Sequence, residues 1–173
     1  MTIIPSRIGW LPIPPFLVGG VFPYLATYLD AFLPVSGVAL PPFGAWRWLG
    51  VAPFLMGFTL ALVSARLIYA SQQWNKQPTP LGVPRRLVLV GPYRHVRNPM
   101  FLGMLQIVLG EGLYFQSLAI LIYLVTLCFF GHFFIILGEE RRLEGQFREE
   151  YERYKREVGR WLPRWTPYKG DLS

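Results

Sequence analysis

The chain has 173 residues, of which 53% are hydrophobic and 16% aromatic, and its mean hydropathy is +0.34. This composition argues against a soluble single domain and predicts a small integral membrane protein. The formal net charge of +7 could suggest a nucleic-acid partner, but the arginines flank apolar segments, as membrane anchors do, and no nucleic-acid-binding motif is recognisable. The single cysteine, Cys128, excludes an internal disulfide and a multi-cysteine metal site, so no metal is expected.

Apolar segments along the chain predict about four transmembrane helices. The first, Leu11–Phe32, contains Pro23, which membrane helices tolerate, whereas Trp46–Ala70 and Leu113–Leu137 are long apolar runs. A shorter segment, residues 99–110, is too short to cross a hydrocarbon core of about 30 Å unaided, so we expect a short spanning helix or a re-entrant one. The proline-broken N-terminus lacks the features of a signal peptide and is expected to stay in the mature chain.

Loop charges predict the orientation of these helices. The Ala31–Ala45 loop and the Glu111-Gly112 tip carry no Lys or Arg, whereas the Ser71–Asn98 loop carries basic residues and no acidic one. The positive-inside rule places the basic loop in the cytoplasm, and four crossings then place both termini there. We therefore expect a multi-pass membrane protein whose motif loop and C-terminus are cytoplasmic. The basic residues of the loop are Lys76, Arg85, Arg86, Arg94 and Arg97.

The C-terminal region predicts an amphipathic helix outside the membrane. Its apolar residues recur at spacings of four, four, three and four, which is one face of an α-helix, and Gly159 can end it. These residues are Leu143, Phe147, Tyr151, Tyr154 and Val158. The helix is expected to rest on the membrane or on the protein's own cytoplasmic surface. Beyond it, Trp161, Trp165 and Tyr168 are typical of an interfacial anchor.

The loop before residue 99 concentrates polar side chains at a predicted helix start. Asn98 can cap a helix and Pro99 suits its first position, while Gly91-Pro92 predicts a turn after the β-favouring residues 87–90. These roles leave unexplained why Tyr93, Arg94, His95 and Arg97 crowd the same few residues. A helix N-terminus flanked by arginine is suited to an anion, either a phosphate or a carboxylate.

An acidic pair follows the last apolar run. Glu139 lies seven residues after His132, so the two should share a helix face. Glu139 and Glu140 beside Arg141-Arg142 are also compatible with a solvated, salt-bridged surface, and a lone His in an apolar helix with a hydrogen-bonded packing role. The residues alone therefore indicate a cytoplasmic pocket with cationic and anionic walls, without naming its ligand.

The ordered motifs of residues 85–168 resemble a known family. A Gly-Pro-Tyr-x-x-x-Arg-x-Pro loop, a hydrophobic hairpin, a Glu-Glu pair and a Phe-x-x-x-Tyr-x-x-Tyr helix are similar to the isoprenylcysteine carboxyl methyltransferase and phospholipid methyltransferase group of integral membrane methyltransferases. The matching residues are Gly91, Pro92, Tyr93, Arg97, Pro99, Glu139, Glu140, Leu143, Phe147, Tyr151, Tyr154 and Trp161-Leu162-Pro163. Asn98 and Phe101 depart from the family's more familiar His and Tyr.

The resemblance implies an all-α integral membrane protein with about four transmembrane helices, one of them short and in a helical hairpin, plus a cytoplasmic amphipathic C-terminal helix. A single domain would cover residues 1–173, with a variable N-terminal half, 1–84, and a cofactor-binding half, 85–168. The implied cofactor is S-adenosylmethionine. Its carboxylate would meet Arg97 and the amides near Asn98, and its ammonium or ribose would meet Glu139 or Glu140.

Site residues follow from the resemblance. The catalytic candidates are Arg97, His95 and Glu140. The cofactor-binding candidates are Gly91, Tyr93, His95, Arg97, Asn98, Pro99, His132, Glu139, Glu140 and Tyr151. Catalysis would be chiefly positioning and desolvation, and an amine or hydroxyl acceptor would need His95 or His132 as a base.

The expected partners are the lipid bilayer and a lipophilic small molecule or prenylated substrate entering from lipid. Its reacting group could be an isoprenylcysteine-like carboxylate, a lipid amine, or a thiol or hydroxyl, and the oligomeric state stays open. A membrane reductase of the sterol reductase type, using a nicotinamide dinucleotide, is the alternative enzyme, but its phosphates would leave Glu139-Glu140 without an obvious partner. A non-catalytic membrane binding protein is the third reading.

Overall fold

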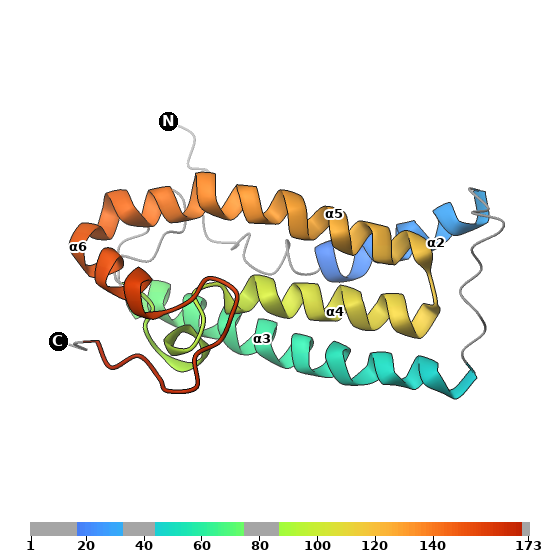
Figure 1. Cartoon of the computed structure of the whole chain (residues 1–173), viewed down its shortest axis with the longest axis horizontal. Helices are drawn as coiled ribbons and strands as arrows, with labels where there is room; N and C mark the ends of the chain where they lie inside the picture. Colours follow the sequence, from blue (N-terminus) through green and yellow to red (C-terminus); the bar gives the residue numbers. More distant parts are fainter. Residues whose placement is uncertain (1–16, 33–43, 75–86, 171–173) are drawn as a thin grey trace.

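The computed structural model describes residues 17–32, 44–74 and 87–170, and these contain helices and no β-strand. In chain order the elements are η1 (Leu17–Val21), α2 (Phe22–Phe32), η2 (Gly44–Gly50), α3 (Val51–Trp74), η3 (Gly91–Arg94), α4 (Pro99–Phe115), α5 (Leu118–Phe134), η4 (Ile135–Glu140) and α6 (Arg141–Glu157). Helices α3, α4 and α5 run side by side along the long axis of the molecule (Figure 1). The all-α prediction is confirmed. The predicted residues 11–16 and the basic positions 76, 85 and 86 lie outside the described residues.

Two helical stretches are long and apolar enough to cross a membrane, Gly44–Ser71 and Leu118–Glu157. The first matches the predicted Trp46–Ala70 segment. Leu17–Leu29 and Pro99–Phe115 are shorter apolar helices. Large apolar side chains lie exposed on α3 and α5, among them Met56 and Phe130, as expected for surfaces that face lipid rather than water.

Glycines bring α3 and α4 into close contact. A Cβ atom on Gly57 would lie 2.5 Å from the carbonyl oxygen of Gly103, and one on Gly110 would lie 2.6 Å from that of Gly50. These pairs are spaced by seven residues on both helices, which places them on one face of each. Small residues at such positions let helix backbones approach closely in a membrane, where dispersion contacts drive helix association.

The turn between α4 and α5 lies further along the chain than the sequence indicates. Glu111-Gly112 was expected at the tip, but α4 continues to Phe115, and the chain turns at Gln116, which adopts a left-handed conformation with φ 55°. Ser117 then caps α5 by accepting a hydrogen bond from the amide of Ile120 at 3.1 Å. As a result Glu111 lies within the helix, and α4 reaches a length of about 25 Å.

Candidate functional site

The motif loop is shaped by a short 3-10 turn. Gly91 has a positive φ of 57°, and a Cβ there would lie 2.8 Å from the Leu67 side chain of α3, so both backbone and space favour glycine. The amides of His95 and Val96 donate to the Pro92 carbonyl at 3.0 and 3.1 Å. Gly91-Pro92 therefore forms the predicted turn and brings the polar residues back toward α3.

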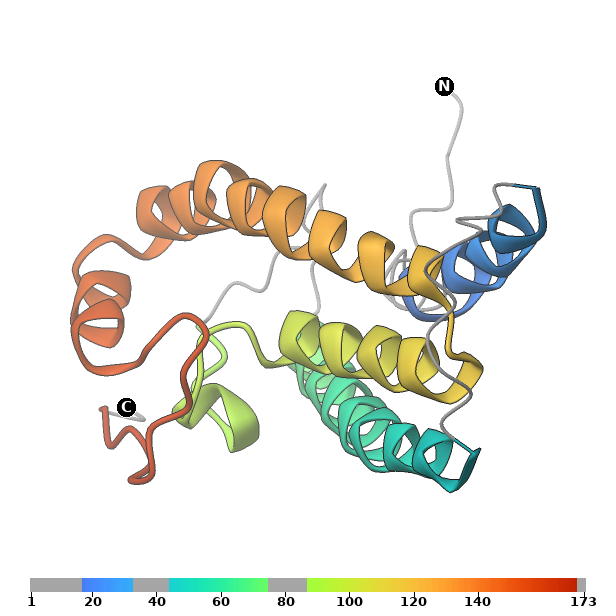
Figure 2. The ribbon, with the colours of Figure 1, turned by 45° about the vertical axis from the view of Figure 1, so that its right-hand side comes forward.

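The C-terminal segment runs alongside this loop and bonds to its backbone (Figure 2). The Arg97 amide donates to the Gly159 carbonyl at 2.9 Å, and the Arg164 amide donates to the His95 carbonyl at 2.9 Å. The ring Nδ1 of His95 lies 2.8 Å from the Arg164 carbonyl oxygen, which can only accept, so Nδ1 carries the proton. His95, a catalytic candidate, is thus a residue that joins the loop to the C-terminal segment.

Helix α6 packs on the protein itself. Its apolar stripe joins residues of the loop and of the C-terminal segment in one buried cluster, comprising Leu89, Tyr151, Tyr154, Val158 and Tyr168, with Leu87, Leu143 and Phe147 against it. The Tyr154 hydroxyl donates to the Tyr93 carbonyl at 2.6 Å. Of the two expected resting places for this stripe, the structure shows the protein's own surface. The predicted helix is present, and the chain kinks within it at Arg148, where φ is 41° and ψ is −113°.

A buried carboxylate lies at the centre of the site. Glu140 Oε1 accepts from Arg97 Nη1 at 2.9 Å and from Arg160 Nε at 2.8 Å, and its Oε2 accepts from Arg160 Nη2 at 2.7 Å. The Glu140 side chain is 5% exposed. Such a forked arginine contact with a carboxylate is strong and directional. Pairing with Glu140 also raises the pKa of Arg160, so the Arg160 guanidinium stays charged.

The acidic pair divides into one buried and one exposed residue. Straight-helix spacing places Glu139 on the face of His132, but Ile135–Glu140 is a π-helix, which adds a residue to the turn and brings Glu140 inward instead. Glu139 is exposed and makes no ion pair within the described residues. Glu139 was expected to share a helix face with His132 on the spacing of a regular α-helix, and the π-helix between them changes the register that this expectation assumed.

Unpaired hydrogen-bond donors remain beside the buried carboxylate. Within the described residues, Arg97 Nε and Asn98 Nδ2 are both buried and have no partner. Asn98 occupies the N-cap position of α4, as predicted, but its side chain makes no capping bond there. Because a buried donor without a partner is costly, these nitrogens, on neighbouring residues of the chain, are suited to ligand oxygens.

Tyr93 lies buried behind these donors. Burial, with smaller contributions from nearby Glu139 and Tyr154, raises the pKa of Tyr93 well above its usual range, and Ser64 opposes the shift slightly. The phenol therefore stays neutral at all physiological pH values, so Tyr93 is not a base. Tyr93 lies in the η3 turn, and its backbone carbonyl accepts the Tyr154 hydrogen bond, which ties the loop to α6.

His132 contacts the C-terminal segment through Trp161. The indole Nε1 of Trp161 donates to His132 Nδ1 at 3.1 Å, and the Trp161 ring packs on Phe101 with centroids 5.5 Å apart. His132, Trp161 and Phe101 line a groove of about 510 Å³ between α4 and α5. Other residues of its lining include Leu105, Cys128 and Phe129. An indole nitrogen only donates, so His132 accepts at Nδ1 and, being neutral, carries its proton on Nε2.

Two residues of the site were not found from the sequence in their actual roles. Trp161 was expected as a lipid anchor, along with Trp165 and Tyr168, but Trp161 closes the α4–α5 groove and Tyr168 is buried, whereas Trp165 is 99% exposed. Arg160 was not singled out, although it holds Glu140 with two bonds. Arg160 directly precedes Trp161-Leu162-Pro163, which matches the family motif, and this position could have marked it as a candidate site residue.

Comparisons with known proteins assign the chain to a family. The chain is 30% identical over 133 residues to the cobalt-zinc-cadmium resistance protein CzcN of Cupriavidus metallidurans, a match that covers 76% of this chain and 60% of that protein. No solved structure matches the chain significantly. A sequence model of the phospholipid methyltransferase family matches residues 45–150, which include α3, the motif loop, the α4–α5 hairpin and the acidic pair. The chain therefore belongs to the phospholipid methyltransferase family.

Proposed function

We propose that the protein transfers a methyl group from S-adenosylmethionine to a lipophilic acceptor within the membrane. The observation that carries the proposal is the pair of buried donors without a partner among the described residues, Arg97 Nε and Asn98 Nδ2, together with Glu139, whose carboxylate makes no ion pair in the described part of the chain. Opposite charges at these positions match the carboxylate and the ammonium of the donor's amino-acid end. The sulfonium supplies an activated methyl group when bound.

The residues would divide their roles as follows. Arg97 and Asn98 would hold the carboxylate, and Glu139 the ammonium. Glu140, bonded to Arg97 and Arg160, would fix the Arg97 guanidinium so that its Nε is presented to the ligand. Glu140 and His95 would then be positioning residues rather than catalytic ones, because both oxygens of Glu140 bond to arginines and His95 bonds through Nδ1 to the Arg164 carbonyl.

We place the acceptor in the α4–α5 groove. The groove is apolar, its outer rim is formed by exposed aromatic side chains of α5, and its cytoplasmic end lies at Trp161, the neighbour of Arg160. No Asp, Glu, Lys or Arg lines it within the described residues. An apolar chain entering sideways from lipid would fit such a groove, with its reacting group at the end near Arg97.

The tautomer of His132 favours an acceptor that is already ionised. Because Nδ1 accepts the Trp161 hydrogen bond, the other ring nitrogen is a donor, so neutral His132 offers the groove no base. An amine would need a proton removed, whereas a carboxylate would not. A carboxylate oxygen that takes the methyl group releases no proton, since the electron pair of the broken C–S bond neutralises the sulfonium. We therefore propose a carboxylate on an apolar chain.

Binding of S-adenosylhomocysteine tests the cofactor site. We expect calorimetry in detergent to show binding by the wild-type protein. Glu139→Gln and Asn98→Ala should each weaken it by about 1.5 to 3 kcal/mol, the range for a hydrogen bond to a charged group. Glu149→Gln, a change at an exposed carboxylate of α6, is the matched control and should leave the affinity unchanged. Wild-type affinity in both site variants would contradict the assignment.

The methylated product tests the acceptor. With radiolabelled methyl donor and a choice of a prenylated carboxylate, a lipid amine and a long-chain thiol, we expect a base-labile methyl ester. Phe129→Trp should narrow the groove and raise KM for the acceptor about tenfold while cofactor affinity persists. Phe130→Trp is the matched control, because Phe130 is similarly exposed but does not line the groove. A stable methylamine product, the chemistry that the family's name suggests, would overturn the carboxylate assignment.

Membrane orientation completes the proposal. The described part of the basic loop, with Arg94 and Arg97, lies at the same end of the helices as α6 and the C-terminal segment (Figure 2). Since positive charge favours the cytoplasmic side, we propose that this end, with the cofactor site, faces the cytoplasm. The multi-pass arrangement with α4 as a short spanning helix belongs to the same proposal.

A further inference from the structure

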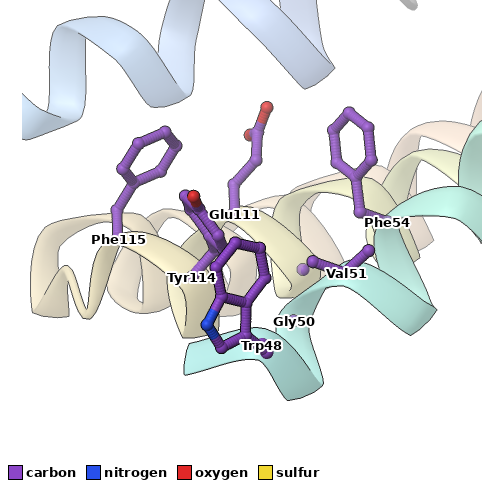
Figure 3. A pocket seen from close by; sticks show the side chains of 8 residues that line it. Trp48, Gly50, Val51, Phe54, Glu111, Tyr114 and Phe115 are labelled. Carbon is purple, nitrogen blue, oxygen red and sulfur yellow. The ribbon is translucent and has the colours of Figure 1, made fainter. Parts of the chain in front are cut away.

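A second pocket, of about 400 Å³, is lined by residues at the start of α3 and at the end of α4, whereas the motif loop precedes the start of α4. It is formed by the start of α3 with the preceding η2 turn and by the last turns of α4 (Figure 3). We propose that this pocket binds the ammonium head group of a zwitterionic phospholipid. The inference does not rest on methyl transfer, because the pocket and the cofactor site share no residue.

The anionic element of the pocket is Glu111. Its side chain projects from α4 between the rings of Phe54 and Phe115 (Figure 3), and its Oε2 atom is buried with no hydrogen-bond partner in the described part of the chain. Among described residues, no Lys or Arg lines the pocket. A buried carboxylate oxygen with no partner among the described residues is suited to a ligand. The ligand it calls for is a cation.

Aromatic rings supply the walls. Trp48 and Tyr114 meet edge to face with centroids 5.5 Å apart, and Tyr114 and Phe115 do so at 5.3 Å. The Arg47 guanidinium lies 4.5 Å from the Tyr114 centroid, so this ring already attracts a cation, yet Arg47 does not line the pocket. Aromatic walls around a carboxylate are the chemistry that recognises alkylammonium groups.

The position of the pocket identifies a lipid as the source of that ammonium. Trp46 and Trp48 are exposed at the end of the long apolar Gly44–Ser71 helix, which is where tryptophan marks the level of the lipid head groups. Arg47, between them, makes no ion pair within the described residues and is available to the lipid phosphate. Exposed Leu55 and Met56 on α3 offer apolar surface to the acyl chains.

Native mass spectrometry of the full chain in detergent tests this with phosphatidylethanolamine and phosphatidylglycerol added separately. We expect phosphatidylethanolamine to bind the wild-type protein more tightly, and Glu111→Gln to weaken that binding about tenfold. Trp48→Leu should weaken it as well, whereas Trp46→Leu, equally exposed but outside the pocket, should not. Thermal unfolding of each variant in detergent confirms that the fold is intact.

Three results would overturn the inference. One is equal retention of phosphatidylethanolamine by wild type, Glu111→Gln and Trp48→Leu. Another is a preference for phosphatidylglycerol, which would assign the site to Arg47 and an anionic lipid. The third is displacement of the bound lipid by choline chloride at matched concentration, which would point to a soluble ammonium compound. S-adenosylhomocysteine binding should be unchanged in Glu111→Gln, so failure here and failure of the proposed activity are distinguishable.

Discussion

Replacing Glu140 by alanine is expected to destabilise the folded protein by about 3 to 5 kcal/mol, because removing one member of a buried ion pair leaves the other charge without compensation. Here two cations lose their partner at once, since Arg97 and Arg160 both bond to this carboxylate and the Arg97 side chain is 10% exposed. Denaturant or thermal unfolding of the detergent-solubilised protein, followed by tryptophan fluorescence, measures the loss.

Glu139→Ala is the matched control, since the two glutamates are adjacent in the sequence. Glu139 is exposed and has no ion pair within the described residues, so its removal should change the free energy of unfolding by no more than about 0.5 kcal/mol. Glu139→Ala should stay folded and yet lose cofactor affinity, because Glu139 would hold the ammonium of the cofactor. Equal destabilisation by both variants would contradict the inward position of Glu140.

This contrast shows which parts of the site the sequence could specify. Asn98-Pro99 at a helix start and Gly91 in a turn depend on the chemistry of a few neighbouring residues, so both were predictable. The α6 stripe was predictable as well, because helical periodicity places its members on one face. The surface that covers this stripe was not predictable, because a lipid surface and a protein surface are both apolar and require the same spacing of apolar residues.

The remaining features arise from contacts between distant parts of the chain. The C-terminal segment bonds to the motif loop through residues about seventy positions apart, as in the pairs His95 with Arg164 and Arg94 with Tyr168. No local pattern encodes such pairing. The π-turn at Ile135–Glu140 is similar, because one extra residue in a turn changes which glutamate faces inward while leaving the hydrophobic pattern intact.

The packing of α3 against α4 affects the position of the motif loop. Leu67 of α3 lies against Gly91, so the distance between α3 and α4 determines where the motif loop sits relative to the start of α4 at Pro99. The glycine contacts further along the two helices hold that distance. A side chain placed between them should therefore alter both stability and cofactor binding.

Gly57→Ala tests this, because helix propensity and helix packing predict opposite effects of the substitution on the free energy of unfolding. Helix propensity alone predicts that alanine stabilises a helix interior by about 1 kcal/mol relative to glycine. At Gly57, however, the new Cβ would lie 2.5 Å from the Gly103 carbonyl oxygen and 2.8 Å from the Ile107 amide nitrogen, both backbone atoms that cannot rotate away. The helices must move apart, so we expect destabilisation of about 3 kcal/mol, at the upper end for overpacking, measured by unfolding in detergent.

Gly20→Ala is the control for this substitution, because a Cβ there has no atom within 4 Å among the described contacts. It should be neutral or slightly stabilising, as propensity predicts. Gly57→Ala should in addition weaken S-adenosylhomocysteine binding, since displacement of α3 moves Leu67 away from Gly91 and loosens the loop that carries Arg97. If Gly57→Ala instead raised the unfolding temperature, propensity would outweigh packing, and the close approach of α3 and α4 could not be what positions the site.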